Sequence, residues 1–131
     1  PAREIGPALM GQLDVVIMNR VEAQFYQAFF SNPAYQRLTK IITKGADGLD
    51  LILPDGACQS FPAFEVPSLS SHGAGDVFVG ALAAQRLAQI PWESALRYAQ
   101  AAAALHVATP RHQRSEITPS DIKALIQNSA L

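Results

Sequence analysis

Residues 68–84, SLSSHGAGDVFVGALAA, change character at Gly73. The part before Gly73 is polar and rich in serine, whereas small and apolar residues follow it at helical spacing. We therefore predict that the turn Gly73-Ala74-Gly75-Asp76 starts a helix over residues 74–89. Two interpretations of this turn are open: an ordinary helix start, in which aspartate is favoured, or an anion site with a base attached.

The second interpretation follows from the physics of a helix N-terminus. Unpaired N–H groups and the positive end of the helix dipole attract anions, and glycines let a phosphate approach the backbone closely. Asp76, in the first turn, could accept a proton from an attacking hydroxyl group. For these four residues taken alone, the ordinary helix start is the more common explanation, because short motifs predict function loosely.

The rest of the chain alternates apolar runs with helical patterns. Strands are predicted at residues 13–19, 40–45, 49–54 and 57–64. The last two strands are joined by the turn Pro54-Asp55-Gly56. Further helices are predicted at residues 20–30, from Pro91 or Trp92 onward, and from a Thr118 cap to about Asn128. This order predicts an α/β fold with a largely parallel sheet, in which ligands bind beyond the carboxyl ends of strands.

Asn19 and Glu22 follow the first predicted strand and are separated by one helical turn, so both can face one ligand. An amide oxygen and a carboxylate suit Mg²⁺, directly or through its water shell. The local alternative is that Asn19 caps the helix and Glu22 completes a capping box. The two interpretations are compatible, but the local sequence favours the cap.

Thr43-Lys44-Gly45 follows the second predicted strand, and Gly48 comes three residues later. Backbone N–H groups of this glycine turn could line a nucleotide, although for the segment taken alone an ordinary turn between strands is the better explanation. The segment is not a P-loop, because the spacing and the Lys-Ser/Thr end are missing.

Composition excludes several classes. The chain has 131 residues, a net charge of −1 and a single cysteine, Cys58, which argues against nucleic-acid binding, an anionic-membrane surface, a structural zinc site and a disulfide framework. No apolar run reaches the ~18 residues of a spanning helix, and the N-terminus lacks the layout of a signal peptide. We expect a cytoplasmic protein without nucleic-acid or membrane partners.

Other residues are given structural interpretations. We expect His72 to be a loop residue, His106 a packed, hydrogen-bonded histidine, and Cys58 inert packing in a strand. The aromatic cluster is predicted to be core, with residues Phe25, Tyr26, Phe29 and Phe30. The basic cluster is predicted to be a solvated loop, with residues Arg111, His112 and Arg114.

The order of the motifs along the chain is more specific for a family than any one motif alone. N-x-x-E after a strand, T-x-G-x-x-G after a strand, and G-A-G-D-x-F opening an alanine-rich helix resemble the ribokinase-like (PfkB-type) carbohydrate kinase family. The segment HGAGDVFVGALAA is similar to the second signature of that family. The resemblance implies a Rossmann-like, three-layer α/β/α fold with a mainly parallel sheet, of which residues 1–131 would form the C-terminal nucleotide-binding and catalytic portion.

By that resemblance, the protein would transfer phosphate from ATP to a sugar hydroxyl. Asp76 would be the catalytic base, and Gly73, Ala74 and Gly75 would form the anion hole. Asn19 and Glu22 would organise Mg²⁺ through water. The ATP-binding residues would be Thr43, Gly45, Gly48 and Gln100.

The sequence departs from the family in two places. Ser70-Ser71 stands where the family usually has Asp-Thr, and TPRHQRS lacks the usual Gly-Ala turn, so both contributions to a K⁺ site are changed. We therefore expect no dependence on K⁺, with Arg111 or His72 supplying positive charge. The family chain is also roughly twice as long, which suggests a fragment whose partner is the missing N-terminal half; homodimerisation is left open. The competing functions are an inactive nucleotide-binding remnant and a kinase for a nucleoside or vitamin-like alcohol.

Overall fold

The computed structural model describes residues 6–129. The chain divides into two compact units, the first ending at Ala63 and the second beginning at Phe64. Each unit is described by itself.

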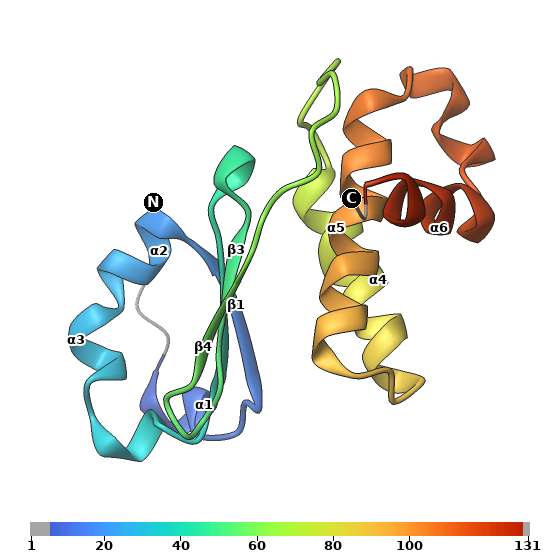
Figure 1. Ribbon diagram of the computed structural model, residues 1–131. Helices are drawn as coiled ribbons and strands as arrows, with labels where there is room; N and C mark the ends of the chain where they lie inside the picture. The colour runs from blue at the N-terminus through green and yellow to red at the C-terminus, as the bar shows by residue number, and fades with distance from the viewer. Residues whose placement is uncertain (1–5, 130–131) are drawn as a thin grey trace. The chain divides into compact units, whose positions relative to one another are not determined.

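The first unit contains the sheet (Figure 1), which has four strands that pair in the order β1-β2-β3-β4. Its strands are β1 (Val15–Asn19), β2 (Thr39–Thr43), β3 (Leu49–Ile52) and β4 (Cys58–Phe61). β1 and β2 are parallel, whereas β2 pairs with β3 and β3 with β4 in antiparallel fashion. The sheet is therefore mixed, because the two tight turns after β2 and β3 return the chain directly, and only the helical connection between β1 and β2 permits parallel pairing.

Helical segments of the first unit are short. They are α1 (Pro7–Met10), α2 (Arg20–Phe25), α3 (Gln27–Phe30) and the 3₁₀ turns η1 (Pro33–Tyr35) and η2 (Gly45–Asp47). The single helix predicted at 20–30 is divided at Tyr26, where φ is −91° and ψ is 6°. Backbone hydrogen bonds nevertheless continue through the division, from Tyr26 to Glu22 (3.0 Å) and from Phe30 to Tyr26 (3.0 Å).

The first unit buries residues on both faces of its sheet, because Met18 pairs with Ile42 and is buried on the face opposite to Ile41. Residues alternate along β2 and β3, so that Thr39, Ile41, Leu49 and Leu51 are buried while their neighbours are half-buried. The prediction that the aromatic cluster is core was wrong. Phe25 is 52% exposed, and the others are only half-buried. Their rings pack against one another, with centroids 4.9 Å apart for Phe25 and Tyr26 and 5.9 Å apart for Phe29 and Phe30, on two short helices that contain no buried residue.

Cys58 lies in a strand, as predicted, but it is exposed, so its interpretation as inert packing was wrong. The physical reason is the position of β4 as the last strand of the described sheet, where Cys58, Gln59 and Ser60 are all exposed and only Phe61 is buried.

The second unit is helical (Figure 1). It contains α4 (Ala74–Leu87), α5 (Trp92–Ala108), the 3₁₀ helix η3 (Arg111–Glu116) and α6 (Pro119–Asn128). The predicted helix over 74–89 ends two residues early, and Gln89 then adopts a positive φ of 60°. Thr118 caps α6 in a capping box with Asp121, as the sequence predicted.

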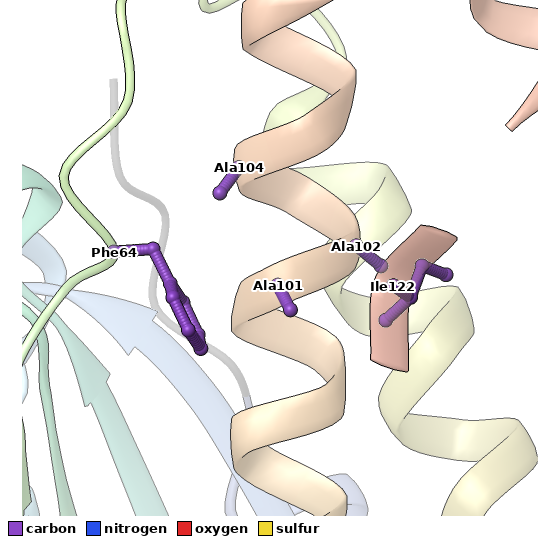
Figure 2. Packing of buried hydrophobic residues seen from close by; sticks show 5 residues of the cluster. All are labelled: Phe64, Ala101, Ala102, Ala104 and Ile122. Carbon is purple, nitrogen blue, oxygen red and sulfur yellow. The ribbon is translucent and has the colours of Figure 1, made fainter. Parts of the chain in front are cut away.

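The core of the second unit is built on α5, whose small residues allow its neighbours to pack closely. Figure 2 shows Phe64, Ala101, Ala102, Ala104 and Ile122 in the cluster of buried residues. Ala101 is completely buried. The guanidinium group of Arg97 lies 3.9 Å from the centre of the Phe64 ring, and burial lowers the pKa of Arg97. Several alanines of α5 are thus among the most deeply buried residues of the described chain.

Candidate active site

Gly73 makes the turn that starts α4. Its φ of +83° lies in the left-handed region that glycine adopts without steric cost, and Ala74 is the first helical residue. The Ala74 amide donates to Ser71 O (3.2 Å) and the Val77 amide to Gly73 O (3.1 Å). Because Gly73 has no side chain with which to cap the helix, the first-turn amides of Gly75 and Asp76 can donate to a ligand.

Gly75 and Asp76 are both exposed in this first turn. A Cβ atom added to Gly75 would meet no atom within 4 Å, so the space beside this residue is open. Asp76 adds a carboxylate next to the same amides. The turn therefore combines donors for an anion with a carboxylate that can accept a proton.

Asn19 and Glu22 form the capping box that the sequence allowed. The Glu22 amide donates to Asn19 Oδ1 (2.8 Å), and the Asn19 amide donates to Glu22 Oε2 (2.9 Å). Each side chain uses one oxygen in the cap. Asn19 is exposed and Glu22 half-exposed, so solvent reaches the site.

The sheet brings Asn19 next to Thr43. Asn19 is the last residue of β1 and pairs in register with Thr43, the last residue of β2. The Thr43 hydroxyl donates to Met18 O at 3.5 Å. Two predicted site residues that are far apart in the sequence therefore lie side by side at the carboxyl ends of two parallel strands, where α/β folds bind ligands.

Gly45 and Gly48 bracket η2, with φ values of +57° and +88°. The Lys44 amide closes the turn by donating to Gly48 O (2.8 Å). A Cβ atom at Gly48 would lie 1.9 Å from Phe61 O, whereas one at Gly45 would meet nothing within 4 Å. The fold of the first unit thus requires glycine at position 48, whereas the space beside Gly45 is open.

Arg20 is a residue that the sequence analysis missed. Its guanidinium group donates to Lys44 O (3.3 Å) and pairs with Asp47. Arg20 therefore ties the start of α2 to the turn that contains Gly45. No local pattern indicated this contact, because its partners lie more than twenty residues away in the sequence.

Lys44 lies in the Thr43-Lys44-Gly45 turn, but no role was predicted for its side chain. Its ammonium group donates to Asp50 Oδ1 (2.8 Å), and the Ser60 hydroxyl donates to the same oxygen (2.7 Å). These two hydrogen bonds, with that of Lys44 the stronger influence, hold the pKa of Asp50 below its usual value. Lys44 is thereby anchored beside the turn.

Gln100 lies on α5, half-buried, and accepts a hydrogen bond from Arg97 (3.0 Å). It belongs to the second unit, together with Gly73, Ala74, Gly75 and Asp76. The first unit holds the remaining predicted site residues: Asn19, Glu22, Thr43, Gly45 and Gly48. Within each unit the structure brings predicted residues together, in one turn of α4 and at one end of the sheet.

Residues 3–119 match the model of the pfkB family of carbohydrate kinases. The chain belongs to this family. The resemblance drawn from the three motifs is therefore confirmed.

A 2-dehydro-3-deoxygalactonokinase from Haloferax volcanii is 34% identical to this chain over 89 residues. This match covers 68% of the chain and 27% of the relative. The matched residues thus correspond to about a quarter of that enzyme.

Solved structures of a ribokinase and a putative ribokinase have the same fold. A ribokinase from Thermotoga maritima has a TM-score of 0.80 at 26% identity, over 98% of this chain and 47% of that protein. A putative ribokinase II from E. coli, in complex with ATP and Mg²⁺, has a TM-score of 0.78 at 21% identity, over 92% and 41%. The ribokinase-like α/β fold is confirmed, and the chain spans less than half of these structures.

Proposed function

We propose that the chain is the nucleotide-binding and catalytic portion of a kinase that transfers phosphate from ATP to a hydroxyl group of a sugar or related alcohol. The observation that supports this proposal most directly is the turn at Gly73, which leaves first-turn amides and the Asp76 carboxylate exposed together. Membership of the pfkB family supports the kinase class.

In this proposal, Asp76 accepts the proton of the attacking hydroxyl group as the oxygen bonds to the γ-phosphorus. The amides around Gly73, Ala74 and Gly75 donate to the phosphoryl oxygens, on which negative charge is spread in the transition state. Glycine at both ends of this turn keeps side chains away from the phosphate. Catalysis of phosphoryl transfer depends mainly on positioning and electrostatic stabilisation, and in this proposal the turn provides both.

The first unit contributes the nucleotide side in this proposal. Thr43 and Gly45 lie along ATP, Gly48 shapes the turn beside them, and Gln100 of the second unit contacts the adenine. Support comes from the open space at Gly45 and from the ATP complex of the structurally similar E. coli protein.

Asn19 and Glu22 would hold Mg²⁺ through water molecules. Among residues 6–129, no three His, Cys, Asp or Glu side chains are grouped to hold a metal ion. An amide and a carboxylate that are shared with a helix cap fit a hydrated Mg²⁺ that takes its other ligands from water and phosphate. Mg²⁺ would neutralise charge on the phosphates when bound.

The test of this function is Asp76→Asn in the intact polypeptide that carries these residues. We expect phosphoryl transfer to fall by about 10²–10⁴-fold, while ATP affinity changes by no more than a few fold. Glu93→Gln is the matched control, because Glu93 is also an exposed acidic residue in the first turn of a helix, α5. Equal activity of Asp76→Asn and the wild type would reject the base role.

A second candidate is a nucleotide-binding module without transfer activity. It is favoured by the coverage, since the chain spans 27% of the curated relative and 47% of the ribokinase. We propose that the partner of the chain is the remaining part of the same kinase. ATP turnover that appears only when this part is added supports the kinase, whereas ATP binding without turnover in the reconstituted protein supports the module.

We also propose that activity does not depend on K⁺, because Ser70 replaces the acidic residue expected there. The rate should change by less than about twofold when K⁺ replaces a large organic cation at fixed ionic strength. A strong rise with K⁺ would overturn this proposal.

A further inference from the structure

The loop that leads into α4 directs two carbonyl oxygens toward basic side chains. Ser70 O accepts a hydrogen bond from Arg114 Nη2 (3.4 Å), and His72 O lies 3.0 Å from His106 Nε2. Because a carbonyl oxygen can only accept, His106 Nε2 carries the proton in this contact. Both donors come from elements that follow α4 in the sequence.

His106 also packs directly against the turn. A Cβ atom added to Gly73 would lie 3.1 Å from His106 Nε2 and 3.7 Å from Cε1. The imidazole ring therefore occupies the space beside Gly73 while it binds the preceding carbonyl. Since Gly73 has a φ of +83°, the contact and the glycine together define the direction in which the chain enters α4.

Arg114 joins the same loop to the end of α5. Its Nε donates to Thr109 O (3.1 Å), and Thr109 is the C-cap of α5. A guanidinium group suits this position, because the last carbonyls of a helix lack intrahelical partners and carry partial negative charge. Arg114 is half-buried, whereas its neighbours Arg111 and His112 are exposed. The positive charge beside Ser70 therefore comes from Arg114, while the sequence had suggested Arg111 or His72.

These contacts matter because of what an anion-binding turn requires. If its amides are to face a phosphate, its carbonyl oxygens must point elsewhere, since they would repel the anion. The amide of Leu69 is also fixed, by donation to Val107 O (2.8 Å). The loop is thus held on both sides of its backbone by α5 and η3.

We propose that Arg114 and His106 are positioning residues for the turn at Gly73: they hold the carbonyls of Ser70 and His72 away from the bound phosphate and so orient the first-turn amides of α4. This inference rests on the proposed function, in which that turn binds the terminal phosphates of ATP. Neither residue touches the nucleotide, and both act through the loop.

The test compares the affinities of the chain for ATP and AMP, measured by calorimetry. AMP lacks the terminal phosphates, so it reports the rest of the nucleotide site. We expect His106→Phe and Arg114→Gln each to weaken ATP binding by about tenfold and AMP binding by less than about twofold. If the two residues had only a structural role, the substitutions would weaken the binding of ATP and AMP equally. That result, or no change in either affinity, would overturn the inference.

The matched control is Arg86→Gln. Arg86 also donates to a backbone carbonyl, Ile90 O (2.8 Å), and stacks on Trp92, but it lies at the other end of α4. This variant should lower the melting temperature without changing the ratio of the two affinities. If His106→Phe or Arg114→Gln fails to fold, His106→Asn and Arg114→Lys, which retain a donor, replace them in the same comparison, with smaller losses expected.

A second measurement without nucleotide separates this inference from the function. Amide hydrogen exchange should accelerate at Ala74 and Val77, whose amides donate to Ser71 O and Gly73 O, in His106→Phe and Arg114→Gln, while the rest of α4 stays protected. Uniform acceleration along α4, or none, would overturn the positioning role. If instead exchange changes as expected but the wild type binds ATP no more tightly than AMP, the proposed function fails and the positioning of the turn stands.

Discussion

Asn19 and Glu22 each bind the other's backbone amide, at 2.8 and 2.9 Å, across the first turn of α2. The two residues proposed to organise Mg²⁺ are therefore also the residues that start this helix. A substitution that removes either side chain would affect both the fold and the metal, so a useful variant must separate the two roles.

Glu22→Gln separates them. Glutamine can still accept the Asn19 amide in a capping box, so the free energy of unfolding should change by less than about 0.5 kcal/mol. The lost charge should raise the Mg²⁺ concentration needed for half-maximal activity by about tenfold, as measured in a Mg²⁺ titration. Asp121→Asn is the control, because Asp121 holds the equivalent position in the capping box of α6. An unchanged Mg²⁺ requirement in Glu22→Gln would leave Glu22 with its capping role alone.

Gly75→Ala tests whether a ligand approaches the start of α4. The added methyl group meets no atom of the protein within 4 Å, so stability should be equal or higher by about 0.5–1 kcal/mol. ATP affinity should nevertheless fall at least about tenfold, because the methyl group would occupy the space of a phosphate. Gly80→Ala, also in open space on α4, is expected to leave affinity unchanged. Equal ATP binding by both variants would contradict the anion site.

Gly48→Ala should be far more damaging to folding than Gly45→Ala. At Gly48 the new Cβ atom would lie 1.9 Å from Phe61 O, and φ is +88°, so we expect a loss above about 2 kcal/mol. At Gly45 only the left-handed backbone disfavours alanine, at about 1 kcal/mol. Thermal unfolding of the two variants provides the comparison. Similar melting temperatures would show that the region around Phe61 can move aside.

Asp50→Asn should reduce stability at neutral pH by about 1 kcal/mol, since solvent screens part of the attraction to Lys44. The pKa of Asp50 is lowered in the folded state, chiefly by its hydrogen bond with Lys44, so its contribution is complete above about pH 5. It is lost as the pH falls below the ordinary value of 3.8 and through the lower folded pKa. Denaturant unfolding from pH 7 to 2 should therefore show the wild type and the variant converging. A constant difference across this range would contradict the ion pair as its cause.

The features that could be predicted from the sequence are those that depend on neighbouring residues. The four strands, the glycine turn before α4 and the Thr118 cap all rest on neighbouring residues, and the structure has each of them. The contacts that hold the site in place could not be predicted in this way. Arg20 reaches Asp47 and Arg114 reaches Ser70 only after the chain has folded, and an arginine in a polar loop looks the same whether it faces solvent or a carbonyl.

Burial was predicted less well for the aromatic residues that follow β1. Phe25 and its aromatic neighbours are apolar enough for a core, but their rings pack against one another, and α2 and α3 contain no buried residue. The chemistry of His106 was predicted correctly as a hydrogen bond, whereas its partner, the carbonyl of His72, was not. The pattern of apolar residues indicates which side chains can be buried. The tertiary fold determines which of these side chains are buried.

The pairing of Asn19 with Thr43 in register has an evolutionary consequence. The 19 residues between β1 and β2 can gain or lose length without moving these two side chains apart, because strand pairing alone sets their proximity. A single deletion within β1 would have the opposite effect, since it would turn every later strand residue to the other face. Insertions that natural variants tolerate should therefore fall in the connection, and the strand ends should keep their length.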